Sequence, residues 1–224
     1  NIISYADGSS ICVYGNCSYR GLSKAFVLNN GSSDNEIYQN NFYGISDNAA
    51  NIDQSSASIH HNLFDIEIES SSGMSISNFS EVNLYNNTFA GAGGGTGLTS
   101  SQSTVSIINN IFSDFETGID YNSDLPNNQI RFNDVSSISN AAYFGTGLPV
   151  MIGSYVNEVL TFAGDTVLTD IYGNMNANPE YAMPSENNFE LQLISPCINN
   201  GDPSLELDPD GTFSDIGAFY KDNF

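Results

Sequence analysis

Acidic side chains dominate the ionisable residues of this 224-residue chain, and they limit the chemistry that it could perform. The sequence has 26 Asp and Glu against four Lys and Arg, with two His, for a formal net charge of -22. Hydrolysis of a glycosidic bond needs two carboxylates about 5 to 9.5 Å apart, and Asp65 and Glu67 are candidates for such a pair. Acidic residues are spread along the whole chain, so the sequence identifies no catalytic residue.

Basic side chains are too few to suggest a second reaction, the cleavage of uronate chains by a lyase. A lyase acting on uronates needs a basic side chain to remove the proton beside the sugar carboxylate, usually with calcium. The cationic residues are Arg20, Lys24, Arg131 and Lys221. None of them lies in an Asp-rich phrase, and the sequence therefore favours a non-catalytic protein over an enzyme.

A run of oxygen-bearing residues near the C-terminus has the spacing of calcium ligands. Its members are Asp208, Asp210, Thr212 and Asp215. Oxygen ligands at alternate positions around a glycine resemble the first half of a calcium-binding loop. The acidic ligand expected at the twelfth position is missing, because residue 219 is Phe. The run predicts either a calcium site or an Asp/Gly-rich turn, and calcium is the only cofactor that the sequence suggests.

A six-residue phrase, apolar-x-x-Asn-x-Phe, recurs along the chain and must position these side chains. Copies begin at Ile37, Ile59, Leu84 and Ile107, with a weaker copy at Ile130. A period in the twenties is typical of a solenoid, in which each coil buries its apolar positions against the next. A leucine-rich repeat would carry several Leu and a helical segment per unit. Short strands separated by Asn, Ser and Gly turns instead predict an all-β fold, a right-handed parallel β-helix with about 22–25 residues per coil.

The register of the phrase predicts three columns of equivalent residues. The apolar anchors form one inward stack, and a second stack contains Phe42, Phe64, Phe89, Phe112 and Val135. Between them, the bend is marked by Asn40, Asn62, Asn87, Asn110 and Asn133. Asparagine tolerates the left-handed conformation and bonds to nearby backbone. Copies one strand spacing apart could also bond to each other as an amide ladder.

The outward position after each anchor holds an aromatic ring in three consecutive coils. These rings are Tyr38, His60 and Tyr85. A row of rings on one β face is a candidate site for stacking a sugar chain. The alternative is an ordinary cross-strand ladder that stabilises the sheet.

The repeat pattern also divides the chain into two regions. Residues 1–147 are expected to form the β-helix coils, with an insertion at residues 9–20, and residues 148–224 the last coils and an irregular C-terminal cap. Within the insertion, Cys12 and Cys17 are either a local disulfide or two free thiols. Cys197 has no evident partner and is expected to be a small buried core residue.

The C-terminal region carries a family resemblance. Its segments are NMNANPEY (residues 174–181), SPCINNGDP (195–203) and DIGAFY (215–220). With the repeats before it, this region resembles the closing module of secreted bacterial right-handed parallel β-helix proteins, the pectate-lyase-like group. The resemblance implies a secreted β-helix, but that group includes lyases, hydrolases and adhesins. The pectin-hydrolase motifs Asn-Thr-Asp, Asp-Asp and Gly-His-Gly are absent.

Charge and composition restrict the partners. A surface this acidic repels nucleic acids, anionic membranes and, unless calcium bridges them, acidic glycans. No apolar stretch is long enough for a membrane-spanning helix. Glycosylation sequons occur at Asn16, Asn30, Asn78 and Asn86. We therefore expect an extracellular or cell-surface structural or adhesive module that binds polysaccharide or assembles into filaments, the alternative being a polysaccharide-degrading enzyme.

The N-terminal end of the solenoid raises a further expectation. The sequence contains nothing before Asn1 that would cover the first coil, and an uncovered coil exposes unpaired backbone groups. Two explanations are open. Either more coils precede this chain, or copies associate end to end as in a filament.

Overall fold

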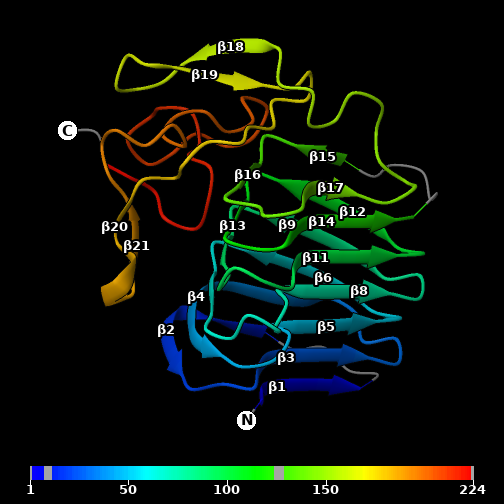
Figure 1. Cartoon of the computed structure of the whole chain (residues 1–224). Helices are drawn as coiled ribbons and strands as arrows, with labels where there is room; N and C mark the ends of the chain where they lie inside the picture. The colour runs from blue at the N-terminus through cyan, green and yellow to red at the C-terminus, as the bar shows by residue number, and fades with distance from the viewer. Residues whose placement is uncertain (1, 8–11, 124–128, 223–224) are drawn as a thin grey trace.

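The computed structural model describes residues 2–7, 12–123 and 129–222, and most of it is a parallel β-helix of about six coils (Figure 1). One face is a seven-stranded sheet in which all neighbours are parallel. Its strands in spatial order are β1 (Ile2–Asp7), β3 (Lys24–Asn29), β5 (Ala50–Asp53), β8 (Met74–Ser77), β11 (Thr96–Ser101), β14 (Thr117–Asn122) and β17 (Ala141–Phe144). The predicted all-β solenoid is confirmed.

Two further faces meet at the asparagine corner. In the first coils, long strands bend around this corner, namely β2 (Cys12–Arg20) and β4 (Asn35–Ile45). Later coils have separate strands on the anchor face, β6 (Ser56–His60), β9 (Glu81–Tyr85), β12 (Thr104–Ile108) and β15 (Gln129–Arg131). The phenylalanine face contains β7 (Leu63–Ile66), β10 (Thr88–Ala90), β13 (Ile111–Ser113) and β16 (Asp134–Ser136).

The core consists of the two predicted apolar columns. The anchors are at most 2 % exposed and pair coil to coil, for example Ile59 with Leu84. The rings of Phe42, Phe64, Phe89 and Phe112 stack with centroids 5.2, 4.7 and 4.9 Å apart. Parallel strands stack equivalent side chains directly above one another, so a Phe in each coil produces a continuous buried stack.

The predicted amide ladder is present, and it is one rung longer than expected. Each side-chain amide donates to the side-chain oxygen of the asparagine in the next coil at 3.0–3.2 Å, from Asn40 up to Asn133. That oxygen also accepts the preceding coil's backbone N–H, for example from Asn62 to Asn87. The ladder ends on Asn174, whose amide donates to the carboxylate of Asp170.

The left-handed residue at this corner is not the ladder asparagine, which corrects our expectation. The positive φ belongs to the residue before it, which is Gln39, His61, Asn86, Asn109 or Phe132, with φ between 50° and 56°. This arrangement turns the chain and leaves the asparagine side chain pointing inward, where it satisfies backbone groups of two coils. Even the large side chain of Phe132 accepts this conformation, which indicates that ladder bonding offsets the local strain.

A second polar ladder lies at the next corner and was not predicted. Its buried serines are Ser32, Ser55, Ser80, Ser103 and Ser123. The hydroxyl of one coil accepts the backbone N–H of the serine below it, at 3.1–3.2 Å in three successive steps. Both corners therefore supply buried side-chain partners for N–H groups that the strands leave unpaired.

The first described coil corrects the predicted insertion. Residues 9–11 lie outside the described part of the chain, but residues 12–20 form β2, which pairs in parallel with β4 on both sides of a bulge between Tyr14 and Cys17. Tyr14 pairs with Tyr38, and Cys17 takes the ladder position opposite Asn40. At the bend β2 has one residue more than β4, because Gly15 and Asn16, with φ of 109° and 55°, lie opposite Gln39 alone, and this extra residue hides the repeat phrase in the sequence.

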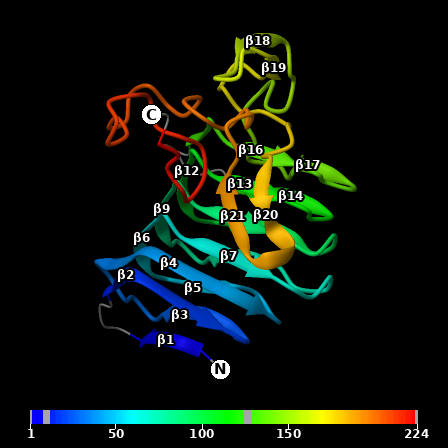
Figure 2. The same cartoon turned by 90° about the vertical axis from the view of Figure 1, so that its left-hand side faces the viewer.

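The C-terminal region covers both the end and one side of the solenoid. The hairpin of β18 (Asn157–Leu160) and β19 (Thr166–Thr169) lies beyond the last coil (Figure 1). The hairpin of β20 (Tyr181–Met183) and β21 (Asn188–Leu191), joined by the 3-10 turn Pro184–Glu186, lies along the phenylalanine face (Figure 2). Phe189 packs there on Tyr43, Leu63 and Ala90.

The amide ladder should dominate local stability. Asn87→Ala removes the acceptor for the backbone and side-chain amides of Asn62 and the donor to two buried carbonyls. We expect the free energy of unfolding in urea to fall by about 2–4 kcal/mol. The control Asn48→Ala, in a turn, should change it by less than about 0.5 kcal/mol. Equal effects of the two variants would contradict a structural role for the ladder.

Candidate functional site

The predicted ring column is present on the anchor face and contains one more ring than expected. The rings of Tyr14, Tyr38, His60 and Tyr85 stack with centroids 5.4, 4.9 and 4.5 Å apart and interplanar angles of 7–9°. Tyr14 was missed because its coil was interpreted as an insertion. The column continues with Ile108, which is buried.

Stacking within the column changes what these rings can bind. Each inner ring has a neighbouring ring against both of its faces, so Tyr38 and His60 have no free face for a sugar. Only their edges and polar atoms remain for contact with a ligand. The column is therefore a cross-strand ladder in its structure, and of the three predicted rings Tyr85 lines a hollow beside it.

That hollow is a groove of about 640 Å³ between the anchor face and the C-terminal tail. Its floor is a column of outward polar side chains, Ser58, Asn83 and Ser106, from three successive coils. Tyr85 and Ile108 border this floor. The opposite wall is formed by Leu205, Glu206, Leu207, Asp208 and Pro209. The groove thus combines hydroxyl and amide groups with apolar side chains on a rigid sheet, as ligand sites commonly do.

The wall is held in place by the left-handed residues of the asparagine corner. The Asn86 amide donates to the carbonyl oxygen of Asp215 at 2.7 Å and to the Ser214 hydroxyl at 3.1 Å. One coil on, Asn109 accepts the backbone N–H of Asp202 at 2.8 Å. Arg131 in the following coil forms an ion pair with Asp202. Because these bonds join residues 71 to 129 positions apart in the sequence, no local pattern predicts them.

Histidines beside the groove are held neutral. Nδ1 of His60 lies 3.0 Å from Nδ1 of His61, and His61 lines the groove. Burial, reinforced by the nearby charge of His60, lowers the pKa of His61 to about 4. Burial also lowers the pKa of His60. Both rings therefore act as hydrogen-bonding groups rather than cations at neutral pH.

The predicted calcium ligands make hydrogen bonds within the tail. Asp210 accepts from the backbone and hydroxyl of Thr212, Asp208 accepts the backbone N–H of Asp215, and Asp215 accepts those of Asn199 and Lys221. Among the described residues, no group of three or more His, Cys, Asp or Glu is arranged to hold a metal. The calcium site stays a prediction.

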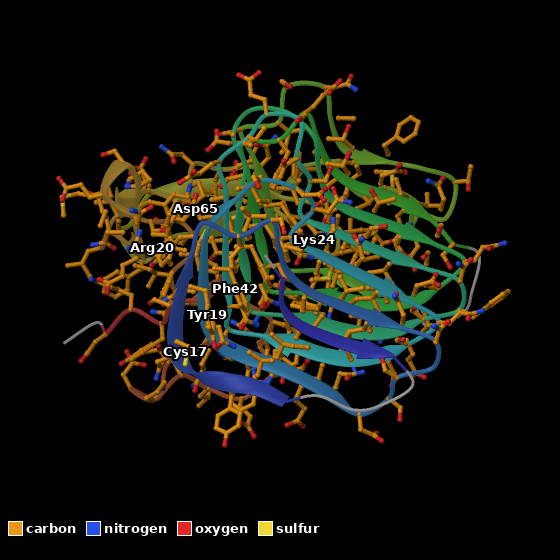
Figure 3. The ribbon with its side chains drawn as sticks, turned by 90° about the horizontal axis from the view of Figure 1, so that it is seen from below. Cys17, Tyr19, Arg20, Lys24, Phe42 and Asp65 are labelled. Carbon is orange, nitrogen blue, oxygen red and sulfur yellow. The ribbon has the colours of Figure 1, made fainter. Side chains whose placement is uncertain are left out.

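The candidate carboxylate pair lies away from the groove. Asp65 is on β7, on the other side of the asparagine corner, and Arg20 lies on the same side of the molecule (Figure 3). Burial and the charge of Glu67 raise the pKa of Asp65 to about 6, although the Gly44 N–H and Arg20 oppose this. The guanidinium of Arg20 lies 4.5 Å from the centre of the Tyr43 ring. A carboxyl whose pKa is raised to about 6 beside a second carboxylate is the feature that favours an acid–base role.

Cysteine and sequon predictions have mixed outcomes. Cys17 has no disulfide among the described residues, and the side chain of Cys12 lies outside them, so the Cys12–Cys17 disulfide stays a prediction. Both belong to β2, on either side of its bend. Cys197 is fully buried, as predicted. The sequon asparagines Asn16, Asn30 and Asn78 are exposed.

Asn86 corrects the fourth sequon prediction. Its side chain is 5 % exposed, and its amide nitrogen is bonded to the tail. A glycan on that nitrogen would displace the tail from the corner. In the folded protein this position is therefore structural.

Comparisons with known proteins do not assign this chain to a family. No family model, no curated protein and no solved structure matches this chain. None of the helices in the described part of the chain is long and apolar enough to cross a membrane. The parallel β-helix is shown by the structure, whereas the resemblance to secreted bacterial members of the pectate-lyase-like group stays a prediction.

Buried carboxyls where the tail meets the solenoid predict a pH dependence of stability. Burial raises the pKa values of Asp134 and Asp215 to about 7 from an ordinary value of 3.8. Their stabilising contribution is therefore complete below about pH 3.8 and is lost as the pH rises through about 7, at up to about 1.4 kcal/mol per pH unit for each group. Thermal melting should occur at a higher temperature at pH 5 than at pH 8.

Asp134→Asn tests the source of this dependence, because asparagine resembles the protonated carboxyl in shape and charge. We expect this variant to lose part of the difference in melting temperature between the two pH values. As a control, Asp120→Asn changes a side chain whose oxygen accepts from Asn122 outside this interface and should keep the full difference. A melting temperature that rises with pH in the unmodified protein would contradict the prediction.

Proposed function

We propose that this chain is a non-catalytic module of an extracellular β-helix protein and that it binds a glycan in the groove beside Tyr85. The observation that carries the proposal is the groove itself, with its floor of hydroxyl and amide side chains and its partly apolar wall. Glycans present many hydroxyls and short apolar patches, so a site for them needs both kinds of group. The floor residues come from neighbouring strands, which hold them at fixed spacing along the solenoid.

The extracellular location rests on separate support. Three sequon asparagines are exposed, and the strong negative charge suits neither nucleic acids nor anionic membrane surfaces. The resemblance of the C-terminal segments to secreted β-helix proteins points in the same direction.

Binding should be detectable with a glycan array followed by titration calorimetry. We expect at least one neutral or amino sugar oligomer to bind and the double variant Ser58→Ala/Asn83→Ala to lose about tenfold in affinity, or about 1.4 kcal/mol. The control Asn51→Ala changes an outward asparagine of β5 on the seven-stranded sheet, away from the groove. Its affinity should match that of the unmodified protein. An array without binding, or equal loss in both variants, would refute the groove as the site.

Hydrolysis is the second candidate, and the raised pKa of Asp65 beside Glu67 is the observation that favours it. Incubation with a panel of neutral and acidic polysaccharides, with and without calcium, should release neither reducing ends nor unsaturated products if the module is non-catalytic. Turnover that Asp65→Asn abolishes, while Asp120→Asn does not, would replace the binding proposal with an enzymatic one.

A further inference from the structure

The groove is surrounded by carboxylates from both of its sides. Glu206 and Asp208 belong to the wall. A second hollow of about 360 Å³ shares Ser58 and Asn83 with the groove, and so continues it toward the first coils. Its lining adds Asp34, Glu36 and Glu81. The path along the anchor face is thus acidic over several coils.

Tyr85 lines the groove and lies within the electric field of these carboxylates. Burial raises the pKa of Tyr85, and the negative charges of Glu36 and Glu206 add to that shift while the Ser58 hydroxyl opposes it. The two carboxylates come from opposite sides, one from β4 and one from the tail. A ligand lying between them would meet negative charge on both flanks.

Positive charge does not compensate these carboxylates within the described residues. Lys24 forms an ion pair with Asp47, and Arg131 pairs with Asp202 below the tail. Arg20 lies over the Tyr43 ring. Neither these cations nor Lys221 line the groove or its continuation. An anionic ligand would be repelled, whereas a cationic ligand would gain attraction along the whole path.

We propose that the ligand of this groove is a glycan with free amino groups, such as a chain of glucosamine units. This inference rests on the proposed glycan binding and adds the charge of the ligand. Protonated amines placed along a sugar chain would lie near Glu36, Glu81 and Glu206 in turn, while sugar hydroxyls contact the Ser58, Asn83 and Ser106 floor. A basic peptide would satisfy the carboxylates equally, but it would offer the floor only its backbone amides, whereas each sugar unit offers several hydroxyls.

Calorimetry of the whole chain with three probes tests the inference. The probes are a glucosamine hexamer, the N-acetylglucosamine hexamer of equal length, and a hexalysine peptide, each at about pH 6, where the amines are protonated. We expect the glucosamine hexamer to bind at least about tenfold more tightly than the other two at about 0.02 M salt. Its advantage over the acetylated hexamer should shrink severalfold at about 0.5 M salt, because the charges lie near the surface.

Two charge variants complete the test. Glu206→Gln should weaken glucosamine binding severalfold and leave N-acetylglucosamine binding unchanged. The matched control Glu116→Gln removes an exposed carboxylate before β14 and should change neither.

The experiment distinguishes failure of the charge inference from failure of the proposed glycan binding. Equal affinity for the two sugars would overturn the charge inference and leave glycan binding standing, whereas hexalysine binding as tightly as glucosamine would overturn the choice of a glycan. Absence of binding by every sugar in this set and on the array would refute both the inference and the proposed function.

Discussion

Backbone N–H groups at the corners of the coils are the constraint on which the rest of this structure depends. Where a strand bends, its N–H groups leave the parallel ladder and would be buried without a partner, at a cost of about 1–3 kcal/mol each. In this protein the side chain of the equivalent residue in the next coil accepts them, through asparagines at one corner and serines at another. Satisfying each corner requires the coils to stack in one register, and that register fixes the Phe core, the ring column and the groove floor.

The sequence predicted those parts of the fold that repeat with strong residue types. An asparagine two positions before a phenylalanine is rare enough to reveal the period, and the period implies the columns. The serine ladder follows the same geometry, but serine is so abundant in this chain that its recurrence carries no signal. The first coil escaped prediction for two local reasons, an extra residue at its bend and Cys17 in place of the ladder asparagine.

The sequence predicted the ring column of the candidate site but not the wall of the groove. The outward positions of Tyr38, His60 and Tyr85 follow from strand alternation, and the structure stacks all three. The wall of the groove depends instead on contacts such as that from Asn86 to Asp215, across 129 residues of sequence. Local pattern contains no information about where such a tail returns. The sequence left open whether the ring faces are free or stacked, and the structure stacks them, because neighbouring parallel strands place equivalent rings face to face.

The asparagine ladder also has a direction. Each side-chain nitrogen from Asn62 to Asn133 donates to the asparagine oxygen of the next coil and to carbonyls of its own and the preceding coil, so these side-chain amides repeat one orientation along the solenoid. Such chains polarise one another, and each bond strengthens those beside it. At one end of the ladder Asn174 donates to the Asp170 carboxylate, while at the other end the side-chain oxygen of Asn40 has no hydrogen-bond partner among the described residues. The two ends of the ladder therefore differ chemically, because a carboxylate accepts hydrogen bonds at one end and a buried amide oxygen lies at the other.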